Sequence, residues 1–262
     1  MPVTRREGYR RMTSTAARSL PSAMADRLIV AVDVPTIREA REMIARLDGV
    51  VSFFKIGLWL AFAEGIDGLL RDLVSSGKRV FLDAKMYDIG RTVEEGVRRA
   101  ADRGVSILTV HGDARIMEAA VKGKGSFPLN IFAISVLTSL DDAGLKEMGY
   151  ALTARELIHL RARQAVRFGC DGMIASAADD PNELRRIAGS DRLLIGTPGI
   201  RGADEKSDDH ARLATPRAAI ERGSDYLVVG RPIVTASDPA ARARAIVAEM
   251  EEGERLASGE AE

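Results

Sequence analysis

The sequence has a single cysteine among its 262 residues, which excludes a disulfide bond within the chain. Cys170 stands in the stretch FGCDGM, where we interpret it as a packed core residue. A chain with a single cysteine is typical of proteins in the reducing cytoplasm. Net charge is also lacking, because 38 basic residues balance 38 acidic ones. No apolar run reaches the roughly 18 residues that a membrane-spanning helix needs. We therefore expect a cytoplasmic protein with no general attraction to nucleic acid or membrane.

Residues 1–25 differ from the rest of the chain in composition. They contain five arginines and one acidic residue, and they are rich in Ser, Thr and Ala. An organelle transit peptide has this composition, but a translation start at Met24 or a disordered tail would give the same pattern. We expect a disordered N-terminal extension over 1–25, one catalytic domain over 26–253 and a C-terminal tail over 254–262.

From Asp26 onward, short apolar runs alternate with segments that have helical periodicity. The runs are too apolar for strands with one solvated face, and they fit parallel strands that are buried on both faces. The predicted strands are 27–33, 50–57, 79–85, 105–111, 129–137, 171–176, 191–197 and 224–230.

A predicted helix follows each of these strands. Of all residues, 46% are hydrophobic, which is enough for a large core. Eight strand–helix units in about 230 residues predict an α/β fold, a single (β/α)8 TIM barrel. A doubly wound open sheet is the alternative, but such sheets usually have five to seven strands. The helical segments are 35–47, about 59–75, 92–104, 114–123, 154–169, 180–189, 215–223 and 238–253.

Polar side chains gather where the predicted strands end. In a TIM barrel the active site lies at the carboxyl ends of the strands. One such residue can be an ordinary surface charge, but a polar residue at nearly every strand end is harder to assign to chance. The residues are Asp33, Lys55, Asp83, Lys85, His111, Thr138, Ser139, Arg201 and Arg231.

The third strand carries the strongest signal, in the stretch FLDAKMYDIGRTV. Because side chains alternate along a strand, Asp83 and Lys85 are expected on one face, with Lys55 from the neighbouring strand beside them and Asp88 just beyond. Charges in a site with little water must be paired or they would neutralise. A structural salt-bridge cluster would look the same, but buried ion pairs contribute little to stability.

Two glycine-rich stretches indicate a phosphate site. TPGIRG follows the seventh strand and VGRPI follows the eighth, so Arg201 and Arg231 stand beside glycines that allow a ligand close to the backbone. The loops after strands seven and eight commonly bind phosphate in TIM barrels. Together the two stretches favour a small phosphorylated substrate.

With these residues in place, the chain resembles the orotidine 5′-monophosphate decarboxylase family from about residue 26 to residue 246. The most specific motif is D-x-K-x-x-D-I-x-x-T, which reads DAKMYDIGRT over 83–92. AVDVP, FKIG, VLTS, TPGIR and VVGRPI match further blocks of the family in the same order. The resemblance implies decarboxylation of orotidine 5′-monophosphate to UMP and CO2 in pyrimidine biosynthesis, without metal or organic cofactor.

The resemblance also implies a role for each charged residue of the core. Lys85 protonates C6 of the pyrimidine, Asp83 lies against the substrate carboxylate, and Asp88 helps to hold Lys85. Lys55 and Asp33 bind ribose hydroxyls. A cofactor-free enzyme must stabilise the carbanion with charges that are already in place, which explains why these charges end an apolar strand. The implied catalytic set is Lys55, Asp83, Lys85 and Asp88.

Further positions are implied to bind substrate across a homodimer with shared active sites. Asp88 and Thr92 reach into the partner's site, and Thr138 contacts the pyrimidine edge. A lid is expected over 202–209. The family normally has a glutamine after this loop, where the chain has His210. The implied substrate-binding set is Asp33, Lys55, Asp83, Thr92, Thr138, Arg201, His210, Gly230 and Arg231.

Two alternatives remain open at this stage. A sister family of metal-dependent sugar-phosphate decarboxylases and synthases keeps a similar D-x-K-x-x-D core, although the isoleucine at 89 and the VLTS and TPGIR blocks favour the pyrimidine enzyme. A catalytically inactive nucleotide-binding barrel is the other alternative, and the four intact charged positions argue against it.

Overall fold

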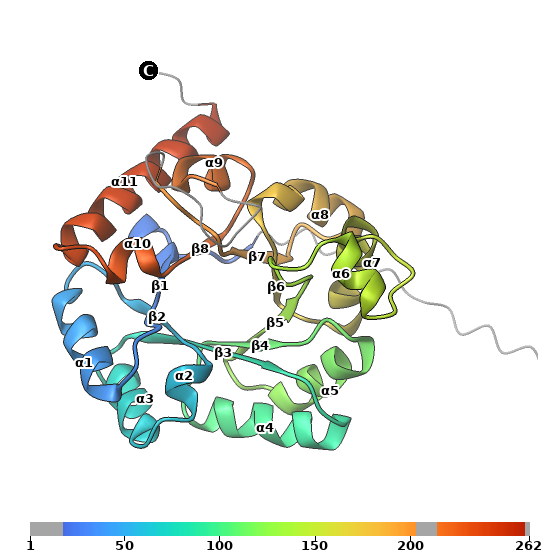
Figure 1. Ribbon diagram of the computed structural model, residues 1–262, viewed down its shortest axis with the longest axis horizontal. Helices are drawn as coiled ribbons and strands as arrows, with labels where there is room; N and C mark the ends of the chain where they lie inside the picture. Colours follow the sequence, from blue (N-terminus) through green and yellow to red (C-terminus); the bar gives the residue numbers. More distant parts are fainter. Residues whose placement is uncertain (1–17, 203–213, 260–262) are drawn as a thin grey trace, which may run out of the picture.

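The computed structural model describes residues 18–202 and 214–259. Eight parallel strands form a closed barrel in chain order, and β8 pairs with β1 to complete it. Viewed down the barrel, the helices form an outer ring around the strands (Figure 1). The strands are β1 (Leu28–Ala31), β2 (Phe53–Ile56), β3 (Arg79–Met86), β4 (Ile107–Val110), β5 (Asn130–Ile134), β6 (Gly172–Ile174), β7 (Leu194–Thr197) and β8 (Tyr226–Val229).

The predicted TIM barrel is thereby confirmed, and the open doubly wound sheet is excluded because the sheet closes. Alternate residues of each strand face opposite sides, so the strands are buried by two separate clusters. One fills the barrel interior and includes Phe53, Phe81 and Phe132, while the larger one lies between strands and helices and includes Phe54 and Leu108. Burial on both faces is the reason why these strands are continuous apolar runs.

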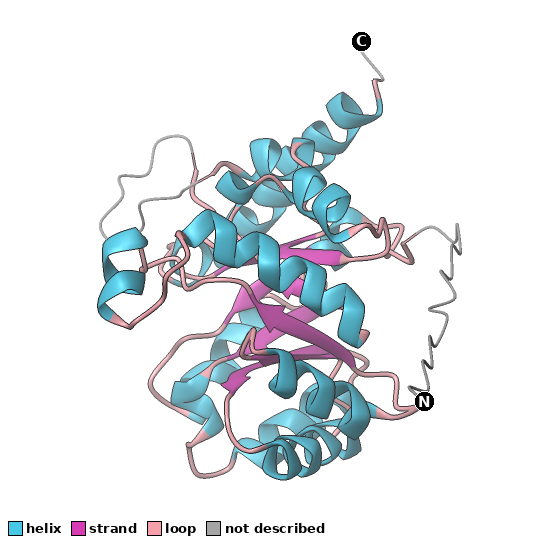
Figure 2. Ribbon diagram, turned by 90° about the vertical axis from the view of Figure 1, so that its right-hand side faces the viewer, coloured by secondary structure: helices cyan, strands magenta, loops and turns pink. Residues whose placement is uncertain are grey.

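The helices cover the outside of the barrel, as the side view also shows (Figure 2). No helix in the described part of the chain is long and apolar enough to cross a membrane. They are η1 (Met24–Arg27), α1 (Ile37–Arg46), α2 (Leu58–Ala61), α3 (Ile66–Ser75), α4 (Gly90–Asp102), α5 (Ala114–Lys124), α6 (Asp142–Glu147), α7 (Ala154–Phe168), η2 (Ala177–Asp179), α8 (Pro181–Ala188), α9 (Pro216–Glu221), α10 (Arg231–Val234) and α11 (Pro239–Ser258).

Several helix boundaries differ from the sequence prediction. The single helix expected over about 59–75 is two helices, because the chain turns between them and Gly65 adopts a left-handed conformation with φ of 88°. The short helices α6 and α10 were not predicted, since neither is long enough to show a periodic pattern. The last helix, α11, continues to Ser258, so the tail expected from 254 begins later.

The end of the expected N-terminal extension belongs to the fold. Leu20 packs against the cluster inside the barrel, at the end where the strands begin, and Arg18 Nε lies 3.3 Å from Oδ1 of Asp225. Met24 is buried in η1. The prediction that 18–25 lie outside the fold was therefore wrong. The rest of the extension, most of the expected lid (203–209) and His210 lie outside the described residues.

Candidate active site

A cavity of about 280 Å³ opens at the carboxyl ends of the strands. Its walls combine charged side chains with an apolar surface from Phe81, Ile134 and Val228. Eight residues that the sequence placed in the site line this one cavity, although they come from six different strands or the loops that follow them. They are Asp33, Lys55, Asp83, Lys85, Thr138, Arg201, Gly230 and Arg231.

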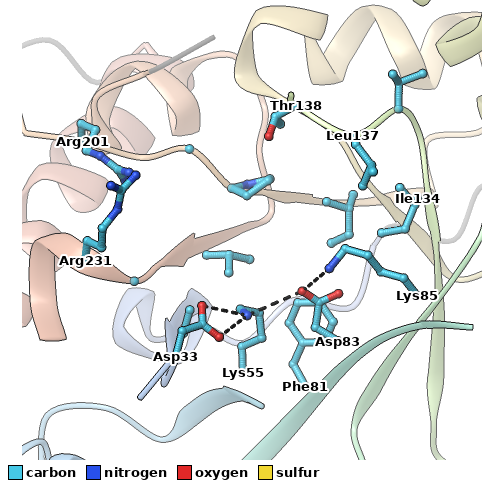
Figure 3. Close-up of a pocket in the computed structure, with 17 residues that line it drawn as sticks. Asp33, Lys55, Phe81, Asp83, Lys85, Ile134, Leu137, Thr138, Arg201 and Arg231 are labelled. Atoms are coloured by element: carbon cyan, nitrogen blue, oxygen red, sulfur yellow. Dashed lines mark hydrogen bonds and ion pairs between the residues drawn. The ribbon is translucent and has the colours of Figure 1, made fainter. Parts of the chain in front are cut away.

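Charges of alternating sign form a connected row along one side of the cavity (Figure 3). Lys55 Nζ lies 3.0 Å from Oδ1 of Asp33 and 3.6 Å from Oδ2 of Asp83. Lys85 Nζ lies 2.8 Å from the same Oδ2 atom of Asp83. Asp83 thus lies between two ammonium groups, and both lysines project toward the space that a ligand would occupy.

Burial and neighbouring charges both act on the pKa of Asp83. Its side chain is only 13% exposed, and burial alone would raise its pKa. The positive charges of Lys85 and Lys55, together with hydrogen bonds from Lys85 and Thr109, outweigh burial and hold the pKa of Asp83 below its ordinary value. Asp83 is therefore a carboxylate at neutral pH.

The backbone of β3 is irregular where it carries these charges. Lys85 has φ of 46°, in the left-handed region that residues other than glycine rarely adopt. The pairing with β4 shifts between Leu82 and Met86, which marks a bulge. Bulges beside active sites commonly re-aim side chains, and this one places Lys85 against Asp83. The sequence contains no glycine or proline here that signals the irregularity.

Gly57 lies against the Asp33–Lys55 pair and was not among the residues predicted from the sequence. It follows β2 and caps the short helix α2. A Cβ atom at this position would lie 2.7 Å from Oδ1 of Asp33 and 3.1 Å from Nζ of Lys55. Glycine therefore leaves the space in which this ion pair forms. The block FKIG contains the signal, because its glycine directly follows the strand that carries Lys55.

Two arginines form the opposite end of the cavity (Figure 3). Arg201 follows β7, and its Nη1 donates a hydrogen bond of 2.7 Å to the carbonyl of Ile200. Arg231 begins α10 directly after Gly230. Gly199 has φ of 76°, so the turn that brings Arg201 to the cavity favours glycine. The guanidinium groups lie together, away from the lysines, and suit an anionic group at one end of a ligand.

Asp88 and Thr92 do not line the cavity of their own chain. Both are exposed, and Asp88 Oδ1 accepts a hydrogen bond of 2.6 Å from the backbone N–H of Ile89, at the start of α4. The side chain of Asp88 is thus held at the surface beside exposed apolar neighbours. Within one chain, the structure leaves these two residues of the predicted set apart from the other site residues.

Four large apolar side chains that follow β2 and β3 are exposed, and the sequence did not predict this. The exposed fractions are 67% for Trp59, 86% for Phe62, 68% for Tyr87 and 74% for Ile89. Single exposed apolar residues are ordinary, but here several large ones follow β2 and β3. The sequence places each residue after a strand, but it does not reveal that their side chains point outward.

Comparisons with known proteins agree with this geometry. The family model described as "Orotidine 5'-phosphate decarboxylase / HUMPS family" matches residues 26–246. An orotidine 5′-phosphate decarboxylase of Rhodopseudomonas palustris (strain BisA53) is 49% identical over 230 residues, 88% of this chain and 97% of that protein. One of Caulobacter vibrioides (strain NA1000 / CB15N) is 48% identical over 226 residues, 86% of this chain and 97% of that protein.

A solved structure is similar as well. The crystal structure of orotidine 5′-phosphate decarboxylase from Lactobacillus acidophilus superposes with a TM-score of 0.75 at 33% sequence identity. The match covers 86% of this chain and 99% of that one. The similarity therefore extends over the whole barrel.

Proposed function

The chain belongs to the orotidine 5′-phosphate decarboxylase / HUMPS family, and we propose that it is a carboxy-lyase that converts orotidine 5′-monophosphate to UMP and CO2 in pyrimidine biosynthesis. The observation that supports this best is the division of the cavity into two ends. A lysine–aspartate row lies at one end and two arginines lie at the other, and between them the wall is largely apolar. A nucleotide with an acidic base and a 5′-phosphate matches this distribution of charge.

The row of charges can carry out the chemical step. The bond between C6 and the carboxylate breaks, CO2 leaves, and the electron pair of that bond remains on C6. Lys85 stabilises this negative charge and then donates a proton from Nζ to C6. Asp83 lies next to the departing carboxylate and is itself ionised, so repulsion between them is relieved when CO2 leaves. The charges are in place before reaction, which lowers the barrier without reorganisation.

The remaining polar residues orient the substrate. Asp33 and Lys55 are paired at the edge of the cavity, where they bind ribose hydroxyls. Thr138 contacts the pyrimidine edge from the loop after β5. Arg201 and Arg231 hold the phosphate together with the backbone of Gly230. Binding energy from the phosphate end can position C6 against Lys85 although it lies far from the reacting bond.

The active site is completed by a second copy of the chain. Asp88 and Thr92 lie outside their own cavity, and Tyr87 and Ile89, which flank Asp88 in the sequence, are exposed apolar residues. In a two-fold symmetric dimer, such a surface meets its own copy and can carry Asp88 and Thr92 to the partner's cavity. Asp88 then adds a second carboxylate near Lys85.

We also place the enzyme in the cytoplasm, so cell fractionation should recover it there.

The decisive experiment mixes the purified protein with orotidine 5′-monophosphate in the presence of EDTA and follows the loss of pyrimidine absorbance. We expect full activity with the chelator and no increase on addition of Mg²⁺. Activity that disappears with EDTA and returns with Mg²⁺ would instead favour the metal-dependent sugar-phosphate enzymes of the same superfamily. Binding of UMP without any turnover would indicate an inactive nucleotide-binding barrel.

A further inference from the structure

Three residues of β3 face one residue of β4 in the irregular part of the barrel. Leu82 pairs with Leu108 and Met86 pairs with Val110, so residues 83–85 lie opposite Thr109 alone. None of the three has an aligned partner in β2 or β4. Backbone groups that lose their ladder partners must find others, because an unpaired buried group is costly.

The side chain of Thr109 takes the place of the missing ladder contact. Its Oγ1 accepts a hydrogen bond of 3.0 Å from the backbone N–H of Lys85 and donates one of 2.8 Å to Oδ1 of Asp83. A hydroxyl has one proton to donate, and here that proton goes to Asp83. Thr109 has 0% of its surface exposed, so water cannot substitute for either contact.

This arrangement separates the two oxygen atoms of the Asp83 carboxylate. Oδ1 is held by Thr109, while Oδ2 is 2.8 Å from Lys85 and 3.6 Å from Lys55. We propose that Thr109 is a positioning residue for decarboxylation, whose hydroxyl fixes the Asp83 carboxylate and the left-handed backbone of Lys85 relative to each other. Thr109 does not line the cavity, so it would act through these two residues.

Only the kinetic effects expected for Thr109 variants rest on the proposed function; the hydrogen bonds of Thr109 do not. In the described part of the chain, the charged groups near Asp83 are Lys85 on its own strand and Lys55 on β2, with Asp33 behind Lys55. From β4 the neighbour is the neutral hydroxyl of Thr109. Removal of that hydroxyl therefore leaves the charges unchanged and removes only its hydrogen bonds to Asp83 and to the backbone of Lys85.

The test compares Thr109→Val, which keeps the shape and removes the hydroxyl, with Thr109→Ser, which keeps the hydroxyl. For Thr109→Val we expect kcat to fall about tenfold to a hundredfold while KM changes less than about threefold, since small misplacement of reacting groups is expensive. The acid limb of kcat/KM should move to higher pH, because Asp83 loses a hydrogen bond that favours its ionised form. Thr109→Ser should restore both towards wild type.

The matched control is Thr197→Val. Thr197 is equally buried on β7, and its hydroxyl bonds to Ser224 at 2.7 Å outside the cavity. This variant should lose stability like Thr109→Val but keep the wild-type pH profile. If both variants lose activity in parallel with stability, or if Thr109→Val keeps wild-type kcat and acid limb, Thr109 has only a structural role.

A second measurement does not depend on turnover. The amide hydrogen of Lys85 should exchange slowly in wild type and in Thr109→Ser, and faster in Thr109→Val, because only the valine variant leaves it without an acceptor. Equal exchange in all three proteins would overturn the proposal. Failure of wild type to decarboxylate the substrate would overturn the proposed function instead, and the exchange result would still decide whether Thr109 holds Lys85 in place.

Discussion

Lys85 Nζ lies 2.8 Å from Oδ2 of Asp83, although the two residues are only two positions apart on one strand. A regular strand would point both side chains to the same face but roughly parallel to each other. Here the left-handed backbone of Lys85 accompanies the close approach. The ion pair that we assign to catalysis is therefore linked to a local departure from strand geometry.

Replacement of Lys85 by alanine tests its role as proton donor. We expect Lys85→Ala to lower turnover by about a thousandfold or more, because the variant lacks both the acid and the charge that stabilises the carbanion. The affinity for UMP should change by less than about tenfold, since the arginine end of the cavity remains intact. Steady-state kinetics and calorimetric titration with UMP measure the two effects. Lys146→Ala, on α6, serves as control and should retain wild-type values.

The backbone of Lys85 leads to a separate prediction about stability. Lys85→Gly should be more stable than Lys85→Ala by about 1 kcal/mol, because glycine adopts a left-handed conformation without the steric cost of a Cβ atom. Urea denaturation of both variants measures the difference. At Lys122, in helix α5, the order should reverse because alanine is the better helix former. If alanine were the more stable variant at position 85 as well, the backbone of Lys85 would not be strained.

The phosphate end of the cavity can be tested with two related ligands. Arg231→Ala should weaken the binding of UMP about tenfold to a hundredfold, through loss of charge-assisted hydrogen bonds. The binding of uridine, which lacks the phosphate, should stay the same within about twofold. Calorimetric titration of each protein with each ligand gives the comparison. An equal loss for both ligands would mean that Arg231 supports the cavity without contacting phosphate.

The proposal of a shared active site predicts recovery of activity in mixed dimers. Lys85→Ala and Asp88→Ala should each be nearly inactive. When they are mixed 1:1 with free subunit exchange, half of the dimers contain one subunit of each kind, and each of these has one intact site. About a quarter of wild-type activity should return, by counting in a symmetric dimer. Native mass spectrometry confirms the exchange, and no recovery despite exchange would place Asp88 in the site of its own subunit.

The lowered pKa of Asp83 predicts how stability depends on pH. A carboxyl group whose pKa is lower in the folded state stabilises the fold above its unfolded pKa of about 4, and this contribution is lost as pH falls through the folded value. The free energy of unfolding of wild type should therefore decrease relative to Asp83→Asn as the pH falls from 7 to below about 4. Urea denaturation across this range measures it. A constant difference would mean that Asp83 has an ordinary pKa.

The sequence predicted the barrel well because its strands are buried on both faces and nearly all of them end at a polar residue. Strand alternation also placed Asp83 and Lys85 on one face, and the structure brings them into contact. The bulge escaped prediction, because it depends on the pairing of β3 with Thr109 on β4, which no local pattern encodes. The packing of Leu20 inside the barrel was missed for the same reason, since a long-range contact decides it.

In β3, three residues lie opposite a single residue of β4, and this affects which parts of the barrel wall can vary between related enzymes. Residues 79–82 hold the strand between its neighbours, and Met86 returns it to β4, so the three residues between them are not needed to close the barrel. Their side chains are therefore not fixed by pairing with β2 or β4. Side chains in residues 83–85 can therefore be replaced within the same barrel, so the chemistry at this position can change without a new fold.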